Sequence, residues 1–459
     1  MFVIDKNNKL PLYIQLYKEI KKDIIANYKS GDKLHSIRKI ASLYNVSKIT
    51  VESAYSQLVV EGYIESYPKS GYIVTDMTNI NSDPNKIQTI TKIQKTEDYL
   101  YDFFPARLDN KSFPLKLWKR LLTKVIDNSL NLGSYPCGQG EYGLRTQIAK
   151  YINEFRGVKC QANQIVICNG FADSMGLLAK IIKKDYDTLA IENPGYQLTS
   201  NVFDSFGYKI KKVGIDNNGL NLDALNNSNA NLVYITPSHQ FPTGVSMPIS
   251  NRLKLIQWAE KRNGLIIEDD YDSELRYSSR PIPSLQGLDN HDRVVFIGTF
   301  SKSLSPAIRV SYMVLPNHLL PLYQQSFDFD ISRVSIITQK TLEKFISDGH
   351  WDRHLRKIRT LNRKKHDLMK KLLLDKLGNS LKIESQGGGL SILINPSVEF
   401  NWTLLKQLSS KKRIKLYFDK EISGGDWEAI HMGFGGLEEH EIESAINIFS
   451  EIWKQCILS

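Results

Sequence analysis

The sequence predicts an α+β head at residues 10–78 and a larger α/β body at residues 98–459, the body having a mostly parallel sheet. Two observations support this division. The head shows helical periodicity followed by a short β-like hairpin, whereas the body alternates short apolar runs with amphipathic helical stretches. Residues 79–97 are polar with few large apolar side chains, and this composition predicts a linker between the two domains.

The composition is that of a globular protein with more than one domain. The chain has 459 residues, 41% hydrophobic and 24% charged, with a net charge of +11 that modestly favours a polyanionic partner. Its four cysteines form no C-x-x-C pair, so no metal site is expected. The N-terminus lacks the apolar core of a signal peptide, and no apolar run approaches the ~20 residues that span a membrane. We therefore expect a cytoplasmic protein without a membrane segment.

Apolar runs in the body predict strands of a parallel sheet. They are rich in β-branched residues and do not alternate with polar ones, as in strands covered on both faces. The helical segments between them predict right-handed crossovers. Ligands of such sheets bind at the carboxyl ends of the strands, so a site is expected in the polar turns that follow the runs. The runs are residues 165–168, 188–192, 232–236, 265–269, 294–299 and 310–315.

In the head, the periodicity predicts three helices. Residues 11–26 place Leu12, Leu16, Ile20 and Ile24 on one helical face. Two further helices follow, joined by a tight turn at residues 44–46, and Ser47 is a suitable N-cap for the second. That second helix has an apolar stripe, predicted to be buried, formed by Val51, Ala54, Tyr55, Leu58 and Val59.

The opposite face of the same helix is polar and suits insertion into a DNA major groove. Arg38, on the preceding helix, is placed to contact phosphate, and residues 63–74 predict a β-wing with Lys69 at its tip. On pattern alone, a small helical domain with a solvated polar face is an equal alternative. The predicted DNA contacts are Arg38, Ser47, Lys48, Thr50, Ser53 and Lys69.

Several motifs of the head resemble those of the GntR class of winged helix-turn-helix repressors. They are L-H-S-I-R (34–38), Y-N-V-S-K-I-T-V (44–51), A-Y-S-Q-L (54–58), E-G (61–62) and K-S-G-Y-I-V (69–74). His35 stands where the class usually has Pro, and Lys48 where it often has Arg. The resemblance implies a winged helix-turn-helix domain that binds double-stranded DNA.

In the body, the motif G-T-F-S-K-S-L-S-P-A-I-R (298–309) carries the strongest chemical signal. Lys302 follows a predicted buried strand, and such a lysine suits a Schiff base beside a phosphate. The hydroxyls of Thr299 and Ser301 and the guanidinium of Arg309 are groups that bind phosphate oxygens. Taken alone, Lys302 is better explained as an exposed surface charge.

A second motif, L-I-I-E-D-D-Y-D-S-E (265–274), supports the reading of a cofactor site. It places Asp269 at the end of a strand and Tyr271 two residues later. A pyridoxal cofactor needs a carboxylate against its ring nitrogen, so that the ring acts as an electron sink, and a donor to its phenolic oxygen. The alternatives are a metal site or a solvated turn. The potential ligands in this motif do not have the spacing of a metal site, which argues against a bound metal.

Two weaker motifs complete the predicted site. N-G-F-A-D-S (169–174) follows a strand and opens a helix, so the backbone N–H groups of Phe171 and Ala172 are placed to bind phosphate. E-N-P-G-Y (192–196) places Tyr196 against a cofactor ring.

These motifs, in this order, resemble the fold-type I aminotransferase superfamily. With T-P-S-H-Q-F-P-T-G (236–244) and G-H-W-D-R-H-L-R-K-I-R (349–359), the whole chain resembles the MocR group of GntR regulators. The resemblance implies pyridoxal 5'-phosphate as cofactor, Lys302 as its Schiff-base lysine, Asp269 at the pyridine nitrogen and a smaller C-terminal subdomain. It also implies a homodimer, with Tyr135 reaching the partner subunit's cofactor, and an operator with two half-sites.

The expected effector depends on His431. It lies in I-H-M-G-F (430–434), where aminotransferases of the superfamily carry an Arg that holds the substrate carboxylate. A neutral imidazole cannot grip a carboxylate bidentately. This predicts the PdxR branch, which responds to pyridoxal phosphate itself and controls vitamin B6 synthesis, with weak or no transaminase activity. Two alternatives stay open: an amino-acid-responsive regulator whose clamp is Arg333 or protonated His431, and an active aminotransferase.

Overall fold

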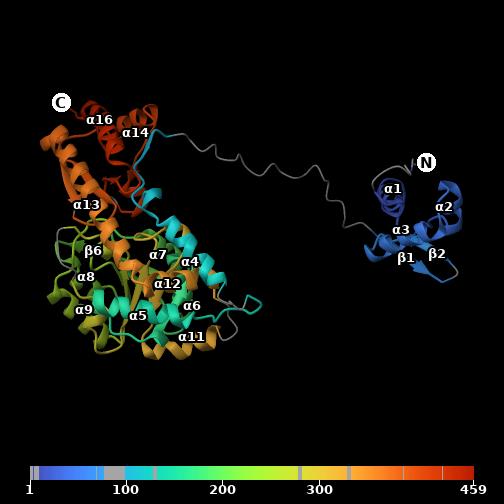
Figure 1. The fold of residues 1–459 in the computed structure, drawn as a ribbon, viewed down its shortest axis with the longest axis horizontal. Coiled ribbons are helices and arrows are strands. Elements are labelled where there is room, and N and C mark those ends of the chain that lie inside the picture. Colours follow the sequence, from blue (N-terminus) through green and yellow to red (C-terminus); the bar gives the residue numbers. More distant parts are fainter. Residues whose placement is uncertain are drawn as a thin grey trace. The chain divides into compact units, whose positions relative to one another are not determined.

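The computed structural model describes Ile4 and residues 10–68, 70–76, 99–127, 132–277, 282–327, 332–385, 387–425 and 427–458. The chain divides into two compact units, Met1–Thr96 and Glu97–Ser459, and each is considered by itself (Figure 1). The predicted linker at 79–97 and the wing-tip Lys69 lie outside the described residues.

The first unit is a three-helix domain with a two-stranded wing, as predicted. It consists of α1 (Leu12–Asn27), α2 (Ile37–Tyr44), α3 (Lys48–Val60) and the antiparallel pair β1 (Ile64–Tyr67) and β2 (Gly71–Val74). The predicted apolar faces of α1 and α3 meet in its core, except that Val59 is only partly buried and Leu12 is half-buried and lies outside the core cluster. The fully or nearly fully buried members are Leu16, Ile20, Ile24, Val51, Ala54, Tyr55 and Leu58.

The turn between α2 and α3 is set by two residues. Asn45 ends α2 in the left-handed conformation, with φ of 49°, which Asn tolerates better than most residues. The Ser47 hydroxyl then accepts a hydrogen bond of 3.1 Å from the Thr50 backbone N–H and caps α3, as predicted. The cap fixes where α3 begins.

The second unit is built on an eight-stranded sheet with the order β4-β11-β10-β9-β8-β5-β6-β7. Strands β10, β9, β8, β5 and β6 are parallel to one another. All six predicted strands form. The bounds are β4 (Ile165–Cys168), β5 (Thr188–Asn193), β6 (Lys209–Asp216), β7 (Gly219–Leu220), β8 (Leu232–Ile235), β9 (Leu265–Asp270), β10 (Val294–Thr299) and β11 (Ser311–Val314).

Two features of the sheet differ from the sequence prediction. Strand β11 was expected to be parallel but is antiparallel to both β10 and β4. Residues 300–310, which join β10 to β11, are too few for a helical crossover. Strand β6 was not predicted, because its sequence K-I-K-K-V-G-I-D is not a continuous apolar run. Because β11 is antiparallel to both of its neighbours, β4 and β10 run in the same direction. The carboxyl ends of β4, β9 and β10 therefore lie at one edge of the sheet.

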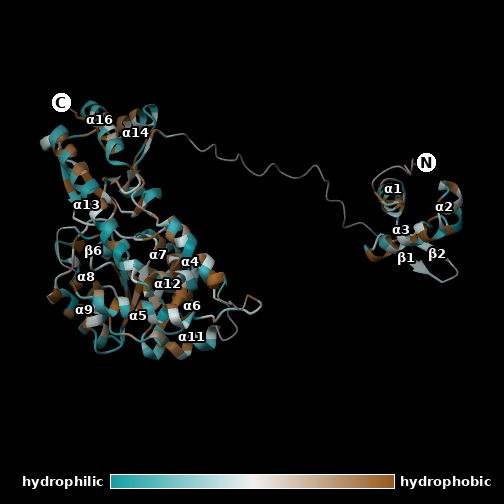
Figure 2. Cartoon of the chain, in the orientation of Figure 1, coloured by the Kyte–Doolittle hydropathy of each residue, from teal (hydrophilic) through white to brown (hydrophobic). Residues whose placement is uncertain are grey.

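Helices cover both faces of this sheet (Figure 1). Ile267 packs towards α6 on one face, whereas its neighbour Ile266 packs towards α9 on the other. The helices carry both hydrophobic and hydrophilic residues, as cover helices do (Figure 2). The first face is covered by α6 (Phe171–Ile182), α7 (Gln197–Ser205) and α11 (Leu320–Phe327). The second face is covered by α5 (Tyr142–Arg156), α8 (Leu222–Asn227), α9 (Ile249–Lys261), α10 (Leu285–Leu288) and α12 (Ile336–Ser347). Helix α4 (Leu115–Asp127) packs against α12.

The predicted C-terminal subdomain is present. The long helix α13 (His350–Leu377) leads to an antiparallel sheet of β12 (Leu381–Ser385), β13 (Ser391–Pro396), β16 (Ile430–Gly433) and β15 (Tyr417–Phe418), which packs with α14 (Trp402–Lys411), α15 (Asp419–Ile422) and α16 (Glu439–Cys456). A separate pair, β3 (Tyr101–Asp102) with β14 (Ile414–Lys415), ties the start of the body to this subdomain. Among the described residues, no helix is long and apolar enough to cross a membrane.

Candidate cofactor site and DNA-binding surface

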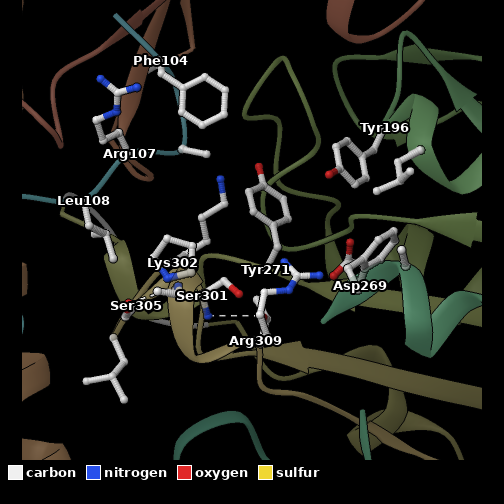
Figure 3. Close-up of a pocket in the computed structure, with 18 of the residues that line it drawn as sticks. Phe104, Arg107, Leu108, Tyr196, Asp269, Tyr271, Ser301, Lys302, Ser305 and Arg309 are labelled. Carbon is white, nitrogen blue, oxygen red and sulfur yellow. Dashed lines mark hydrogen bonds between the residues drawn. The ribbon is translucent and has the colours of Figure 1, made fainter. Parts of the chain in front are cut away.

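A cavity of about 740 Å³ lies where the predicted motifs meet at the carboxyl edge of the sheet (Figure 3). Asp269 of β9 pairs in register with Ile297 of β10, so the turns that follow the two strands are neighbours. The structure brings nearly all predicted cofactor residues into the cavity wall: Phe171, Ala172, Tyr196, Asp269, Tyr271, Thr299, Ser301, Lys302 and Arg309. Tyr135 is outside this wall, and its side chain is exposed.

Lys302 extends into the cavity from the turn after β10 (Figure 3). Burial lowers the pKa of its amine, and the carboxylates of Asp272 and Asp269 oppose that shift. Lowering the pKa increases the fraction of neutral amine, which is the nucleophilic form. The position therefore suits covalent attachment of a carbonyl compound.

Asp269 is a buried carboxylate with one oxygen already bonded. The Tyr234 hydroxyl donates to its Oδ2 at 2.6 Å. Burial raises the pKa of Asp269 to about 7, against the lowering effect of that hydrogen bond. A cationic N–H partner would favour the ionised form. Tyr234 was not predicted as a site residue, although it lies in the predicted run 232–236.

The groups that can bind an anion gather around the start of α6. Gly170 precedes that helix with φ of 81°, and the backbone N–H groups of the first two helical residues, Phe171 and Ala172, come before the first bonds of the helix. A Cβ at Gly170 would overlap the guanidinium of Arg309, which donates to the Asn169 carbonyl at 3.3 Å. Ser301 and Thr299 line the same cavity. Hydroxyls, a guanidinium and helix N–H groups together form a phosphate-type cradle.

Next to Lys302, Tyr271 belongs to a hydrogen-bonded group that the sequence did not reveal. Its hydroxyl donates to the His239 carbonyl at 3.0 Å, and the His239 Nδ1 lies 2.7 Å from Asp272 Oδ2. Both partners occur in motifs of the sequence, at 236–244 and 265–274. Their pairing depends on the neighbouring ends of β8 and β9, which no local pattern reports.

The two predicted effector residues lie in different surroundings. His431 lines an adjoining cavity of about 360 Å³ together with Lys302 and Tyr271, and its Nε2 lies 2.9 Å from Asp419 Oδ1. Arg333 lines neither cavity and pairs with Asp173 at 3.2 Å. The structure thus brings His431, but not Arg333, to the neighbourhood of Lys302.

In the head, the predicted DNA contacts other than Lys69 lie on α2, on α3 or at the N-cap of α3. Arg38, Ser47, Lys48 and Ser53 are exposed, and Thr50 is half-buried. The Ser47 hydroxyl is engaged by Thr50, through both the backbone bond of the cap and a 2.8 Å contact to Oγ1.

Comparison with known proteins matches each unit to a family. Residues 12–74 match the bacterial regulatory proteins of the gntR family, and residues 106–420 match aminotransferase class I and II. The chain is 34% identical over 460 residues to the uncharacterized HTH-type transcriptional regulator YdeL of Bacillus subtilis (strain 168), with 98% of each chain covered. It is 30% identical to the probable rhizopine catabolism regulatory protein MocR of Rhizobium meliloti, over 86% of this chain and 83% of that one.

The chain belongs to the MocR-type regulators of the GntR family. A further relative of this MocR-type chain is the pyridoxine biosynthesis transcriptional regulator PdxR of Corynebacterium glutamicum, 29% identical over 79% of each chain. The body also superposes on the multiple substrate aminotransferase of Thermococcus profundus, with a TM-score of 0.70, 21% identity and 79% and 92% of the two chains covered. That likeness confirms the predicted fold of the body.

Proposed function

We propose that this regulator binds pyridoxal 5'-phosphate in the 740 Å³ cavity and that the bound cofactor changes the affinity of the head for DNA. The observation that carries the proposal is the convergence of Lys302, Asp269 and Arg309 on one cavity. When bound, the cofactor supplies a reactive carbonyl and an electron-withdrawing ring. The amine, the buried carboxylate and the anion cradle match its aldehyde, ring nitrogen and phosphate.

In this proposal, each predicted cofactor residue has a distinct task. Lys302 forms the covalent link, and Asp269 accepts the hydrogen bond of the ring N–H. Tyr271 donates to the phenolic oxygen in place of the His239 carbonyl, and Tyr196 packs against the ring. The phosphate is held by Thr299, Ser301, Arg309 and the N–H groups of Phe171 and Ala172. In a homodimer, the exposed Tyr135 serves the partner subunit's site.

The proposed role is sensing rather than catalysis. The position where aminotransferases of the superfamily carry a carboxylate-binding Arg holds His431, and a buried carboxylate engages that ring. We therefore propose weak or no transaminase activity. The absence of a carboxylate-binding Arg at position 431 supports pyridoxal phosphate itself as the effector. The similarity to a relative named as a pyridoxine biosynthesis regulator supports vitamin B6 synthesis as the controlled process.

The cavity beside His431 favours a second candidate. It offers room for a small ligand in contact with Lys302, so a regulator that responds to a second small molecule through the bound cofactor is also supported.

In either case we propose a cytoplasmic homodimer that binds two DNA half-sites through Arg38, Ser47, Lys48, Thr50, Ser53 and Lys69.

Absorbance spectra of the protein with added pyridoxal phosphate test the proposal. The wild type and the exposed-lysine control Lys254→Ala should both show the band of protein-bound cofactor, whereas Lys302→Ala should lose it. Binding to a DNA fragment selected from a random pool is then measured with and without cofactor, and a coupling of about 1–3 kcal/mol changes affinity about 5- to 150-fold. A persistent band in Lys302→Ala, or equal DNA affinity in both states, would contradict the proposal.

A further inference from the structure

The cavity beside His431 adjoins the cofactor cavity and is here called the second cavity. It has a volume of about 360 Å³. Small ligands occupy cavities of this order of size. A molecule in the second cavity would lie directly beside a cofactor held by Lys302, because the two cavities share wall residues: Phe104, Ala106, Tyr196, Phe241, Tyr271 and Lys302.

The charged groups around the second cavity are carboxylates paired with histidines. His239 Nδ1 lies 2.7 Å from Asp272 Oδ2, and His431 Nε2 lies 2.9 Å from Asp419 Oδ1. Asp419 is fully buried, and its other oxygen accepts from the Ser423 hydroxyl at 2.6 Å. Among the described residues of the wall, Lys302 is the one side chain of Lys or Arg type.

Arg107, Arg309 and Arg333 are not among the wall residues of the second cavity, and each has another partner. Arg107 lines the cofactor cavity, but it pairs with Asp102 at 2.8 Å and is turned away from the Lys302 amine (Figure 3). Arg333 pairs with Asp173, and Arg309 lies at the anion cradle. A carboxylate entering the second cavity would lose its hydration, find no guanidinium among the described wall residues and meet the carboxylate of Asp272.

An amine finds better partners in the same space. His239 Nε2 is buried and has no hydrogen-bond partner in the described part of the chain. In the tautomer that donates Nδ1–H to Asp272, Nε2 is an acceptor, which an amine N–H can satisfy. Aromatic rings complete the wall: Phe241 stacks on His431 at 5.6 Å, and Phe104 packs edge-on against Tyr417 at 5.2 Å. Such faces also stabilise an ammonium group.

We propose that the second cavity binds a primary amine that has no carboxylate, and that the His239–Asp272 and His431–Asp419 pairs discriminate against amino acids. The proposal rests on the proposed function for the site of the cofactor, and it adds the chemical class of a second ligand. The proposal specifies two features of the ligand, an amino group and the absence of a carboxylate. It does not specify the rest of the ligand.

Matched pairs that differ only in the carboxylate test this preference. The cofactor-loaded full chain is titrated calorimetrically with tyramine and tyrosine, phenethylamine and phenylalanine, histamine and histidine, and putrescine and ornithine. In at least one pair the amine should bind at least about tenfold more tightly, because an unpaired buried charge costs more than the ~1.4 kcal/mol of a tenfold change. Equal or tighter binding of the amino acid in every pair, or no amine binding in any, overturns the proposal.

Two variants assign the preference to the named residues. His431→Arg combined with Asp419→Asn supplies a guanidinium without its opposing carboxylate, and should strengthen amino-acid binding about tenfold. The control His440→Arg introduces an arginine at an exposed position. It should leave the relative affinities of the amine and the amino acid in each pair unaltered. His239→Leu removes the unpartnered acceptor and should weaken amine binding alone. If both cavity variants retain the wild-type order, the proposal fails.

Failure of the proposed function gives a different result. If no cofactor band forms, the assignment of Lys302 fails, and the order within each pair is then measured on the cofactor-free chain. If the band forms and pyridoxal phosphate changes DNA affinity, but the pairs show no preference, then only the assignment of the second cavity fails.

Discussion

Tyr234 donates a 2.6 Å hydrogen bond to Oδ2 of Asp269, and both residues are buried at the end of the central sheet. The bond lowers the pKa of Asp269, but burial outweighs it and raises that pKa to about 7. In the ligand-free protein the carboxylate is therefore costly to ionise. A cationic ring N–H at this position removes that cost, so the arrangement favours ligand binding over stability of the empty site.

Replacing Asp269 with Asn should stabilise the ligand-free protein and weaken cofactor binding. The folded-state pKa lies above the unfolded value, so the folded protein binds more protons and its stability falls as pH rises from about 4 to about 7. Asn carries no charge and still accepts from Tyr234. Thermal unfolding from about pH 5 to about pH 8 should show a flatter dependence for Asp269→Asn than for wild type. Added pyridoxal phosphate should stabilise it less.

The exposed-surface control for that change is Asp204→Asn, which should keep the wild-type pH dependence. An Asp269→Asn protein with the wild-type dependence and unchanged stabilisation by the cofactor would remove Asp269 from the site.

Replacing Gly170 with Ala should weaken cofactor binding through Arg309. Gly170 and Gly157 both have positive φ, 81° and 65°, but a Cβ at Gly157 meets nothing within 4 Å, whereas one at Gly170 overlaps the guanidinium. Each substitution should cost about 1 kcal/mol or more through backbone strain. Only Gly170→Ala should also reduce cofactor affinity, by about tenfold, because Arg309 must move. Equal cofactor affinities, measured by absorbance titration, would exclude this role of Arg309.

The fold could be predicted where burial acts on a continuous stretch of sequence. The run 265–269 becomes most of β9, which is buried on both faces. Its first three residues are apolar, Glu268 accepts hydrogen bonds from the backbone N–H groups of Leu285 and Gln286, and Asp269 reaches the cavity. Strand β6 escaped prediction because three of its side chains are exposed lysines. The direction of β11 is a property of its connection to β10, not of its own residues.

The residues of the candidate site also fall into those that the sequence could predict and those that it could not. Lys302 and Asp269 could be predicted because Asp269 lies near the end of β9 and Lys302 lies shortly after β10, and parallel strands share a carboxyl edge. Asp419 and Phe104 could not. Asp419 meets His431 only because β15 pairs with β16, and Phe104 reaches the cavities after β3, which pairs with the distant β14. Contacts of this kind depend on tertiary pairing, which the local sequence does not encode.

Replacing Arg38 with Ala should weaken DNA binding without regard to sequence. Arg38 is exposed in the first turn of α2, the position from which such a helix contacts phosphate. Losing one phosphate contact should reduce the slope of log affinity against log salt concentration by about one. The exposed Lys22→Ala on α1 is the charge-matched control. Equal salt slopes for wild type and Arg38→Ala would show that Arg38 makes no phosphate contact.

Replacing Ser47 with Ala should loosen the start of the recognition helix. The Ser47 hydroxyl accepts from the Thr50 N–H, and losing such a cap costs about 1 kcal/mol. Amide hydrogen exchange in the full chain should therefore speed up in the first turn of α3, and DNA affinity should fall with it. The control Ser56→Ala removes an exposed hydroxyl within the same helix and should change neither.

Ser47→Asp separates the cap from a direct DNA contact. Asp caps a helix about as well as Ser, so amide exchange in α3 should return to the wild-type rate. Its negative charge faces DNA phosphate, so DNA affinity should stay low even though the helix is restored. If Ser47→Ala weakens DNA binding while exchange in α3 is unchanged, the Ser47 hydroxyl acts on DNA directly, and the cap is not what positions the helix.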